Sequence, residues 1–132
     1  MKEMVYQNIG HDQAELLGRG KYKGYDYYIL SLVTNPCAYV RLTADDSCYG
    51  LDFDDARIDC HGGITYCYKG LRFVEDVGWF IGWDYAHLDD RYGEAVHGKS
   101  WTTAEIEAEC KRVIDQLISI KEDCGKEVVT NA

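Results

Sequence analysis

The residues best suited to chemistry lie at Cys60 to Gly63, where a histidine is followed by two glycines. Glycines accept positive φ and allow close approach to the backbone, so the amides of Gly62 and Gly63 could point at a phosphate or carboxylate. The imidazole of His61 could bind the same anion or donate a proton to it. Paired glycines also mark simple turns, so a hairpin or β-bulge that happens to hold a histidine is the alternative interpretation.

A second polar group follows at Asp84 to Asp90, and it contains His87. Together with His61 it offers enough nitrogen and oxygen donors for a divalent metal, but the spacing matches no established metal motif. Asp84 could instead orient an imidazole for acid–base catalysis. No serine or cysteine nucleophile motif accompanies these residues. We therefore predict no catalytic residue, no metal and no cofactor, and favour a binding protein over an enzyme.

The most aromatic stretch is Gly78 to His87, which holds two of the three tryptophans within five residues. As a strand it places four large side chains on one face: Trp79, Ile81, Trp83 and Tyr85. That face either fills a core, which we expect for at least one tryptophan, or offers a floor on which a planar ligand stacks. In the second case Tyr66 would join Trp83 and Tyr85 against a base, each stack contributing about 1–3 kcal/mol. Arg41 and Arg57 would supply charge for phosphates.

The composition limits the classes of function. The 132 residues suit one domain with its own core, and 46% of them are hydrophobic. A net charge of −9 argues against generic nucleic-acid binding, which needs an excess of lysine and arginine. No apolar run is long enough to cross a bilayer, and the first residues carry no apolar signal region. We expect a cytoplasmic protein with no membrane partner, whose six cysteines stay reduced.

Alternating apolar residues predict a β-rich body over residues 5–98. Gly18-Arg19-Gly20 has the composition of a hairpin turn, and it leads into Tyr25 to Val33, which is apolar on both faces and so predicts a central strand. Ala38 to Leu42 and Ile64 to Tyr68 alternate like further antiparallel strands. The acidic, weakly periodic segment from Thr43 to Asp59 predicts a long surface loop.

A helix is predicted over about residues 102–123. Thr102 and Glu105 form a Thr-x-x-Glu capping box, with Trp101 in the position of a hydrophobic staple. Apolar residues then recur every three or four positions, a stripe that must cover a sheet face. Gly125 predicts the end of the helix, with a frayed tail over 125–132. The predicted fold is a single α+β domain, residues 1–132, with an antiparallel sheet of four to five strands covered on one face by a long C-terminal α-helix.

The sequence resembles a group of small accessory proteins from phages and prophages of Firmicutes, a group without an assigned activity. The resemblance rests on His61 to Tyr66 (HGGITY) and Gly78 to His87 (GWFIGWDYAH), together with four shorter matches at Tyr25–Leu32, Pro36–Val40, Lys99–Glu105 and Val113–Leu117. It covers most of residues 20–120. Small acidic phage proteins resemble counter-defence factors, so the resemblance implies a protein that acts in the cytoplasm of a bacterial host.

Three functions follow as hypotheses. The first is sequestration of a small nucleotide-derived immune signal, such as a cyclic nucleotide or an ADP-ribose derivative, by the ligand-binding set His61, Gly62, Gly63, Tyr66, Trp83, Tyr85, His87, Arg41 and Arg57. The second is inhibition of a host defence protein, for instance a CRISPR nuclease, through acidic patches at Asp52–Asp55 and Asp89–Asp90. The third is a metal-dependent phosphoesterase that degrades such signals. A homo-oligomer is a further expectation, because small domains often complete a ligand pocket at a subunit interface.

Overall fold

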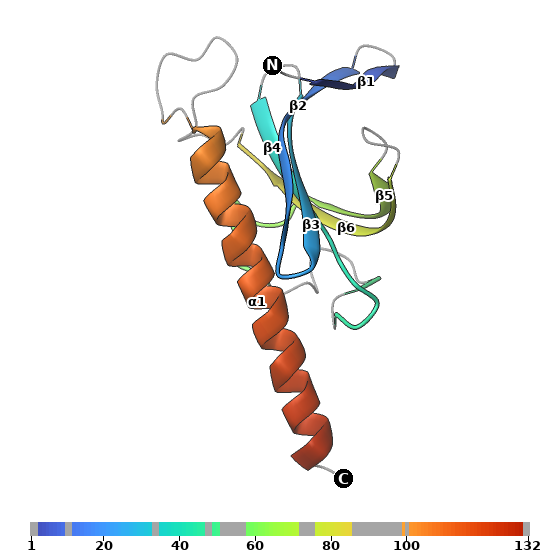
Figure 1. Cartoon of the computed structure of the whole chain (residues 1–132), viewed down its shortest axis with the longest axis vertical. Coiled ribbons are helices and arrows are strands. Elements are labelled where there is room, and N and C mark those ends of the chain that lie inside the picture. Colours follow the sequence, from blue (N-terminus) through green and yellow to red (C-terminus); the bar gives the residue numbers. More distant parts are fainter. Residues whose placement is uncertain are drawn as a thin grey trace.

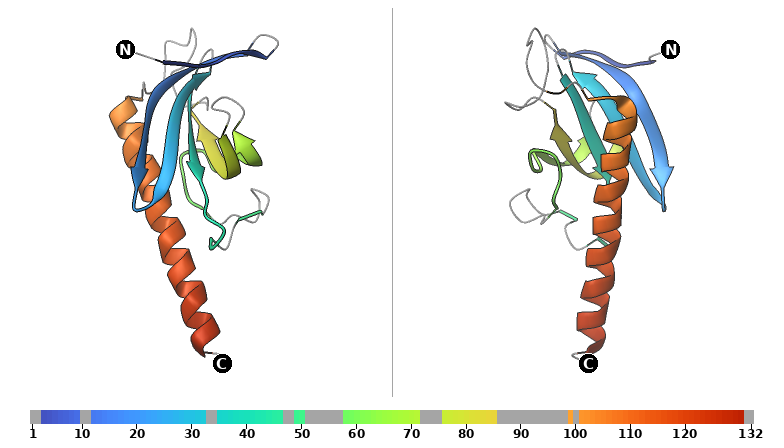
Figure 2. Two further views of the ribbon diagram at one scale, coloured as in Figure 1. Left: turned by 45° about the vertical axis from the view of Figure 1, so that its right-hand side comes forward. Right: turned by 90° about the vertical axis from the view of Figure 1, so that its left-hand side faces the viewer.

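The computed structural model describes residues 3–9, 12–32, 35–46, 49–50, 58–71, 76–85, 99 and 101–130. In this part of the chain six strands form one antiparallel sheet, and one long helix packs against it (Figures 1 and 2). The strands are β1 (Glu3–Ile9), β2 (Asp12–Tyr22), β3 (Tyr25–Leu32), β4 (Asn35–Arg41), β5 (Tyr66–Leu71) and β6 (Asp76–Asp84), and the helix is α1 (Thr103–Thr130). The predicted α+β class is confirmed, and the described sheet has six strands where four to five were expected.

The strand order is β1-β2-β3-β4-β6-β5, so β6 lies between β4 and β5. The hairpin between β2 and β3 turns at Lys23 and Gly24, both with positive φ (49° and 88°), as a two-residue type I′ turn requires. The turn predicted at Gly18-Arg19-Gly20 is wrong, because this segment lies inside β2. Gly20 is needed there for space: a Cβ at this position would come within 2.6 Å of the Tyr27 hydroxyl.

The main hydrophobic core lies between α1 and the sheet. On the helix, a stripe at spacings of three and four is buried: Ile106, Cys110, Val113, Ile114 and Leu117. The helix stripe packs with every second residue from Ile81 onward: Ile81 and Trp83 of β6, and Tyr85, which follows the strand. Trp79, which is partly buried, packs against this cluster. The predicted period-two face of the aromatic strand is confirmed, and so is the burial of at least one tryptophan.

The opposite face of the sheet has a second hydrophobic cluster. It contains Leu16, Tyr28, Leu30, Cys37, Tyr39, Leu71 and Phe80. In β3, neighbours that point to opposite faces are both inaccessible to solvent, since Ile29 and Leu30 have no exposed surface. The prediction that this segment is a central strand, apolar on both faces, is therefore confirmed.

The helix begins as predicted and ends later than predicted. The amide of Glu105 donates to the Thr102 hydroxyl (3.2 Å), and the Thr102 amide donates to the Glu105 carboxylate (3.0 Å), which completes the capping box. The predicted end near Gly125 is wrong, because α1 continues to Thr130 and extends beyond the sheet (Figure 1). A glycine inside a helix costs only about 1 kcal/mol relative to alanine, and the next two residues, Lys126 and Glu127, are good helix formers. No helix in the described part of the chain is both long and apolar enough to cross a membrane.

The segment after β4 was predicted to be an acidic surface loop, but one of its acids is buried. The side chain of Asp46 has 1% of its surface exposed. It accepts hydrogen bonds from the Tyr25 hydroxyl (2.7 Å) and from both the amide (2.8 Å) and the hydroxyl (2.9 Å) of Thr43. Lys121 of α1 lies 3.8 Å away. A buried carboxylate must be paired in this way, so Asp46 ties the segment to β3 and to the helix.

The core between α1 and the sheet predicts a clear stability difference along the helix. Replacing the fully buried Ile114 by alanine should lower the free energy of unfolding by about 2–5 kcal/mol, because it leaves a cavity between helix and sheet. The matched control is Glu122→Ala, at an exposed position of the same helix, which should change it by no more than about 0.5 kcal/mol. Urea denaturation measures both; equal effects would contradict the helix orientation described here.

Candidate functional site

The predicted anion loop at Cys60 to Gly63 is a β-turn. The Gly63 amide donates a hydrogen bond to the Cys60 carbonyl (2.9 Å), and Gly62, at the third position of the turn, has φ of 70°. A positive φ at that position is the mark of a type II turn and requires glycine. The Gly63 amide is thus used within the turn, and the two glycines serve its geometry.

The surroundings of His61 are also unsuited to an anion. Its backbone amide donates a hydrogen bond to the carboxylate of Glu109 in α1 (2.9 Å). The same carboxylate accepts a second hydrogen bond, from Nε of Arg112 (2.7 Å). Hydrogen bonding from Arg112 holds the pKa of Glu109 below its usual value, so this carboxylate is ionised at neutral pH. An ionised carboxylate, paired with Arg112, therefore lies next to the place where a phosphate was predicted. In this structure His61, Gly62 and Gly63 form a turn anchored on the helix, a geometry that does not favour the phosphate cradle predicted from the sequence.

The aromatic residues predicted to hold a base are brought to His61, but as a packed cluster. The His61 ring stacks on Tyr85 (centroids 4.6 Å apart, planes at 8°), and Trp101 meets it edge-on at 4.8 Å. The Trp83 indole N–H donates to the Tyr85 hydroxyl (3.1 Å). Trp83 and Tyr85 are each 1% exposed, so neither offers a face to a ligand from solvent. Their prediction as a stacking floor is corrected to a core role.

The remaining predicted residues are dispersed. Tyr66 packs against the second cluster, its ring edge-on to Tyr39 at 5.2 Å. Arg57 and His87 lie outside the described residues, as do the acidic patches at Asp52–Asp55 and Asp89–Asp90. Asp84 accepts a hydrogen bond from the Thr65 hydroxyl (3.1 Å). Within the described ranges no three histidine, cysteine, aspartate or glutamate side chains gather as metal ligands would.

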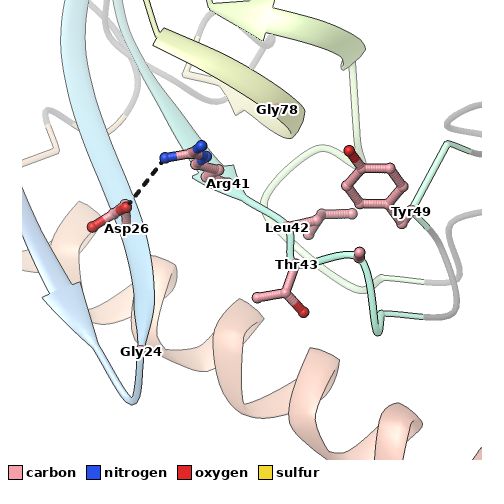
Figure 3. A pocket seen from close by; sticks show the side chains of 8 residues that line it. Gly24, Asp26, Arg41, Leu42, Thr43, Tyr49 and Gly78 are labelled. Atoms are coloured by element: carbon pink, nitrogen blue, oxygen red, sulfur yellow. Dashed lines mark ion pairs between the residues drawn. The ribbon is translucent and has the colours of Figure 1, made fainter.

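Arg41, the remaining predicted residue, lines a surface pocket of about 330 Å³ at the end of β4 (Figure 3). The pocket is formed where the β2–β3 turn, the segment after β4 and the strand β6 come together. Its lining residues are Gly24, Asp26, Arg41, Leu42, Thr43, Ala44, Tyr49 and Gly78. This volume lies at the lower end of the range for small-molecule sites, about 300–1,000 Å³.

A row of charges crosses the sheet into this pocket. Lys21 of β2 lies 3.7 Å from Asp26 of β3, and the guanidinium of Arg41 lies 3.8 Å from the other oxygen of the same carboxylate. Two cations thus flank one anion, in a chain whose net charge is −9. Both distances exceed the 2.7–3.2 Å of a hydrogen bond, so these two ion pairs leave carboxylate lone pairs for donors of a ligand.

A glycine in β6 leaves the space that the guanidinium of Arg41 occupies. Gly78 has φ of 122°, and a Cβ built there would lie 2.8 Å from the Arg41 Nε. Any other residue would therefore be strained and would displace the guanidinium. Thr43, another residue that lines the pocket, is held by its two hydrogen bonds to the buried carboxylate of Asp46. Tyr49, 42% exposed, brings an aromatic ring to the side of the pocket away from Asp26 (Figure 3).

Sequence reasoning found Arg41 but missed its neighbours in the pocket. Asp26 and Arg41 are far apart in the chain and meet only through strand pairing. Tyr49 lies in the acidic segment after β4, where the sequence has no regular apolar pattern from which its position could be predicted. Gly78 carried a usable signal, since a glycine inside a strand often marks close approach of another group.

Fold and pocket together define a small α+β domain with a charged and aromatic surface pocket. Comparisons with known proteins add no relative: no family model, no curated protein and no solved structure matches the chain.

The contact between Glu109 and the turn predicts a pH-dependent contribution to stability. The pKa of Glu109 is lowered on folding, chiefly by Arg112, so its contribution is present above its unfolded pKa and is lost as the pH falls through the folded value. Glu109→Gln should therefore be less stable than the unaltered chain at pH 7. The difference should shrink as the pH falls below about 4.5, the ordinary value for glutamate. Urea titrations across this range measure it; a difference independent of pH would contradict the assignment.

The packing of His61 predicts a structural effect for its removal. The ring contacts Tyr85 and Trp101, and each of these aromatic pairs should contribute about 0.5–1.5 kcal/mol to the free energy of unfolding. His61→Ala removes both pairs and should therefore destabilise the fold by the sum of the two. Thermal or urea unfolding measures the effect. An unchanged stability combined with abolished ligand binding would restore His61 as a site residue.

Proposed function

We propose that this protein binds a small nucleotide-like anion in the pocket around Arg41, and that it acts as a phage counter-defence protein which sequesters a nucleotide-derived immune signal. The observation that carries the proposal is the pocket's combination of a guanidinium, a carboxylate and an aromatic ring. Nucleotide-like ligands have matching groups: a phosphate for Arg41, a flat base for Tyr49, and hydroxyl or amine donors, which Asp26 can accept where they lie beyond the phosphate.

Local charge supports an anionic ligand despite the acidic chain. The guanidinium occupies the space left by Gly78 and pairs with Asp26, so it already lies at the pocket without a ligand. Arg41 can contact two phosphate oxygens at once, and the second cation of the row, Lys21, adds to the field at the pocket. The attraction of Arg41 and Lys21 for an anion acts only near the pocket. It is compatible with a negative net charge that disfavours binding to nucleic acid.

The lining of the pocket favours binding over turnover. Its eight residues include no histidine and no cysteine, and Asp26 is their only carboxylate. Hydrolysis of a phosphate ester needs a positioned base, a nucleophile or a metal. Among the described lining residues the Asp26 carboxylate is paired with Arg41 and Lys21, and no histidine or cysteine accompanies it, which favours a ligand that is held intact, as sequestration requires. The phage context comes from the sequence resemblance.

The proposal predicts that Arg41 carries the affinity for phosphate. With AMP as the probe, Arg41→Met should weaken binding roughly 10- to 100-fold, the value of a charge-assisted hydrogen bond of about 1.5–3 kcal/mol. Arg19→Met is the matched control, because it removes the same charge from a residue of β2 that lies outside the pocket. Isothermal titration calorimetry measures both variants, and their melting temperatures establish that they fold.

An equal decrease in affinity in the two variants, or none in either, would contradict the pocket as the site. Mass spectrometry of small molecules released by heat from protein purified out of cells with nucleotide-based defences is the complementary experiment. An intact nucleotide in stoichiometric amount would support sequestration, and a hydrolysed product would contradict it.

A further inference from the structure

The three ligand-contacting groups of the pocket lie in a definite order. In Figure 3, Arg41 lies between Asp26 on one side and Tyr49 on the other. The ion pair at 3.8 Å keeps Asp26 next to the guanidinium, whereas Tyr49 belongs to the segment after β4. The guanidinium points toward Asp26, and a ligand that contacts all three groups would therefore reach Asp26 and Tyr49 at its two ends, with Arg41 between them.

This order matters for the kind of phosphate that fits. A mononucleotide that stacks its base on Tyr49 and places a terminal phosphate on Arg41 has nothing left to reach Asp26. Its dianionic phosphate would also lie beside an ionisable carboxylate, a like-charge contact that weakens binding. A phosphate joined to a second group on its far side has one negative charge fewer, and that second group can carry donors to Asp26.

From this we infer that the pocket selects a phosphate that links two groups, a base-bearing nucleoside on Tyr49 and a hydroxyl-rich or amine-bearing group on Asp26. Phosphodiester-linked nucleotides have this chemistry. The inference rests on the proposed function and specifies the ligand class for the same site. Asp26 is its specificity-determining residue, because its lone pairs accept hydrogen bonds from the second group.

The pocket's walls suit such a ligand. The segment that carries Tyr49 is held through Asp46, whose carboxylate binds Thr43 and Tyr25. On the other side, Asp26 is held by cations on both neighbouring strands. Asp26 is thus placed beside Arg41 by its ion pair, and Thr43 is held by Asp46. A ligand that reaches both Asp26 and Tyr49 gains contacts that a ligand filling only one subsite lacks.

Calorimetry with two probes tests the inference: AMP, with a terminal phosphate, and adenylyl-(3′,5′)-adenosine, in which one phosphate links two nucleosides. The unaltered chain should bind the linked compound at least tenfold more tightly than AMP, despite its lower charge. Asp26→Asn should then change the two affinities in opposite directions. Binding of the linked compound should weaken about tenfold, because its donors lose a charged acceptor, while binding of AMP should stay equal or strengthen.

The outcomes separate the inference from the function on which it rests. If AMP binds as tightly as the linked compound, and Arg41→Met still removes binding, the ligand class is wrong and the phosphate site stands. If neither probe binds the unaltered chain, both the site and the ligand class are overturned. The comparison of probes on the unaltered chain decides the question even where Asp26→Asn fails to fold.

Discussion

The packing of α1 across the sheet is the constraint on which the rest of the structure depends. The helix buries a stripe of residues against β2, β3 and β4, and the aromatic residues of β6 complete the same core. Burying a large apolar side chain contributes about 1.5–3 kcal/mol to the free energy of unfolding. Exposing Trp83 and Ile81 to a ligand from solvent would lose this contribution. This requirement limits which aromatic residues remain for a ligand: of the large ones in the described part of the chain, Tyr49 and Tyr68 are exposed, and only Tyr49 lines the pocket.

A single buried carboxylate connects this core to the pocket. Asp46 receives hydrogen bonds from Tyr25 of β3 and from Thr43 in the pocket wall, and Lys121 approaches it from the helix. A buried ion pair contributes little net stability, but removal of one partner is costly because it leaves the other charge unpaired. The group therefore acts mainly on geometry: it holds Thr43, in the wall of the pocket, in place relative to β3 and the helix.

The sequence was a good guide where local pattern and burial agree. The alternation from Trp79 to Tyr85 and the helical stripe with its capping box each depend on short-range periodicity, and the structure confirms both. The helix end was missed because Gly125 is a stop signal only when the following residues do not sustain the helix. The hairpin turn was misplaced because Gly18 and Gly20 are also what a strand needs when a neighbouring side chain lies close. In both cases one residue type answers two physical needs, and only the tertiary contacts show which one applies.

The candidate site was harder to predict for a related reason. His61 and its glycines have the residue types of an anion loop, but the charge that reaches them, Glu109, comes from a helix 48 residues further along the chain. The two charges that favour an anion, Lys21 and Arg41, come from β2 and β4 and meet on either side of Asp26 in β3. No motif in the sequence relates the two cations. An anion site depends on the sum of charges within a few ångströms, whereas a motif records only one segment. The charges near the two places therefore favour Arg41 over the histidine turn for the proposed phosphate. At Arg41 two cations, Lys21 and Arg41, face one carboxylate, Asp26. At the turn, the Glu109 carboxylate binds the amide of His61.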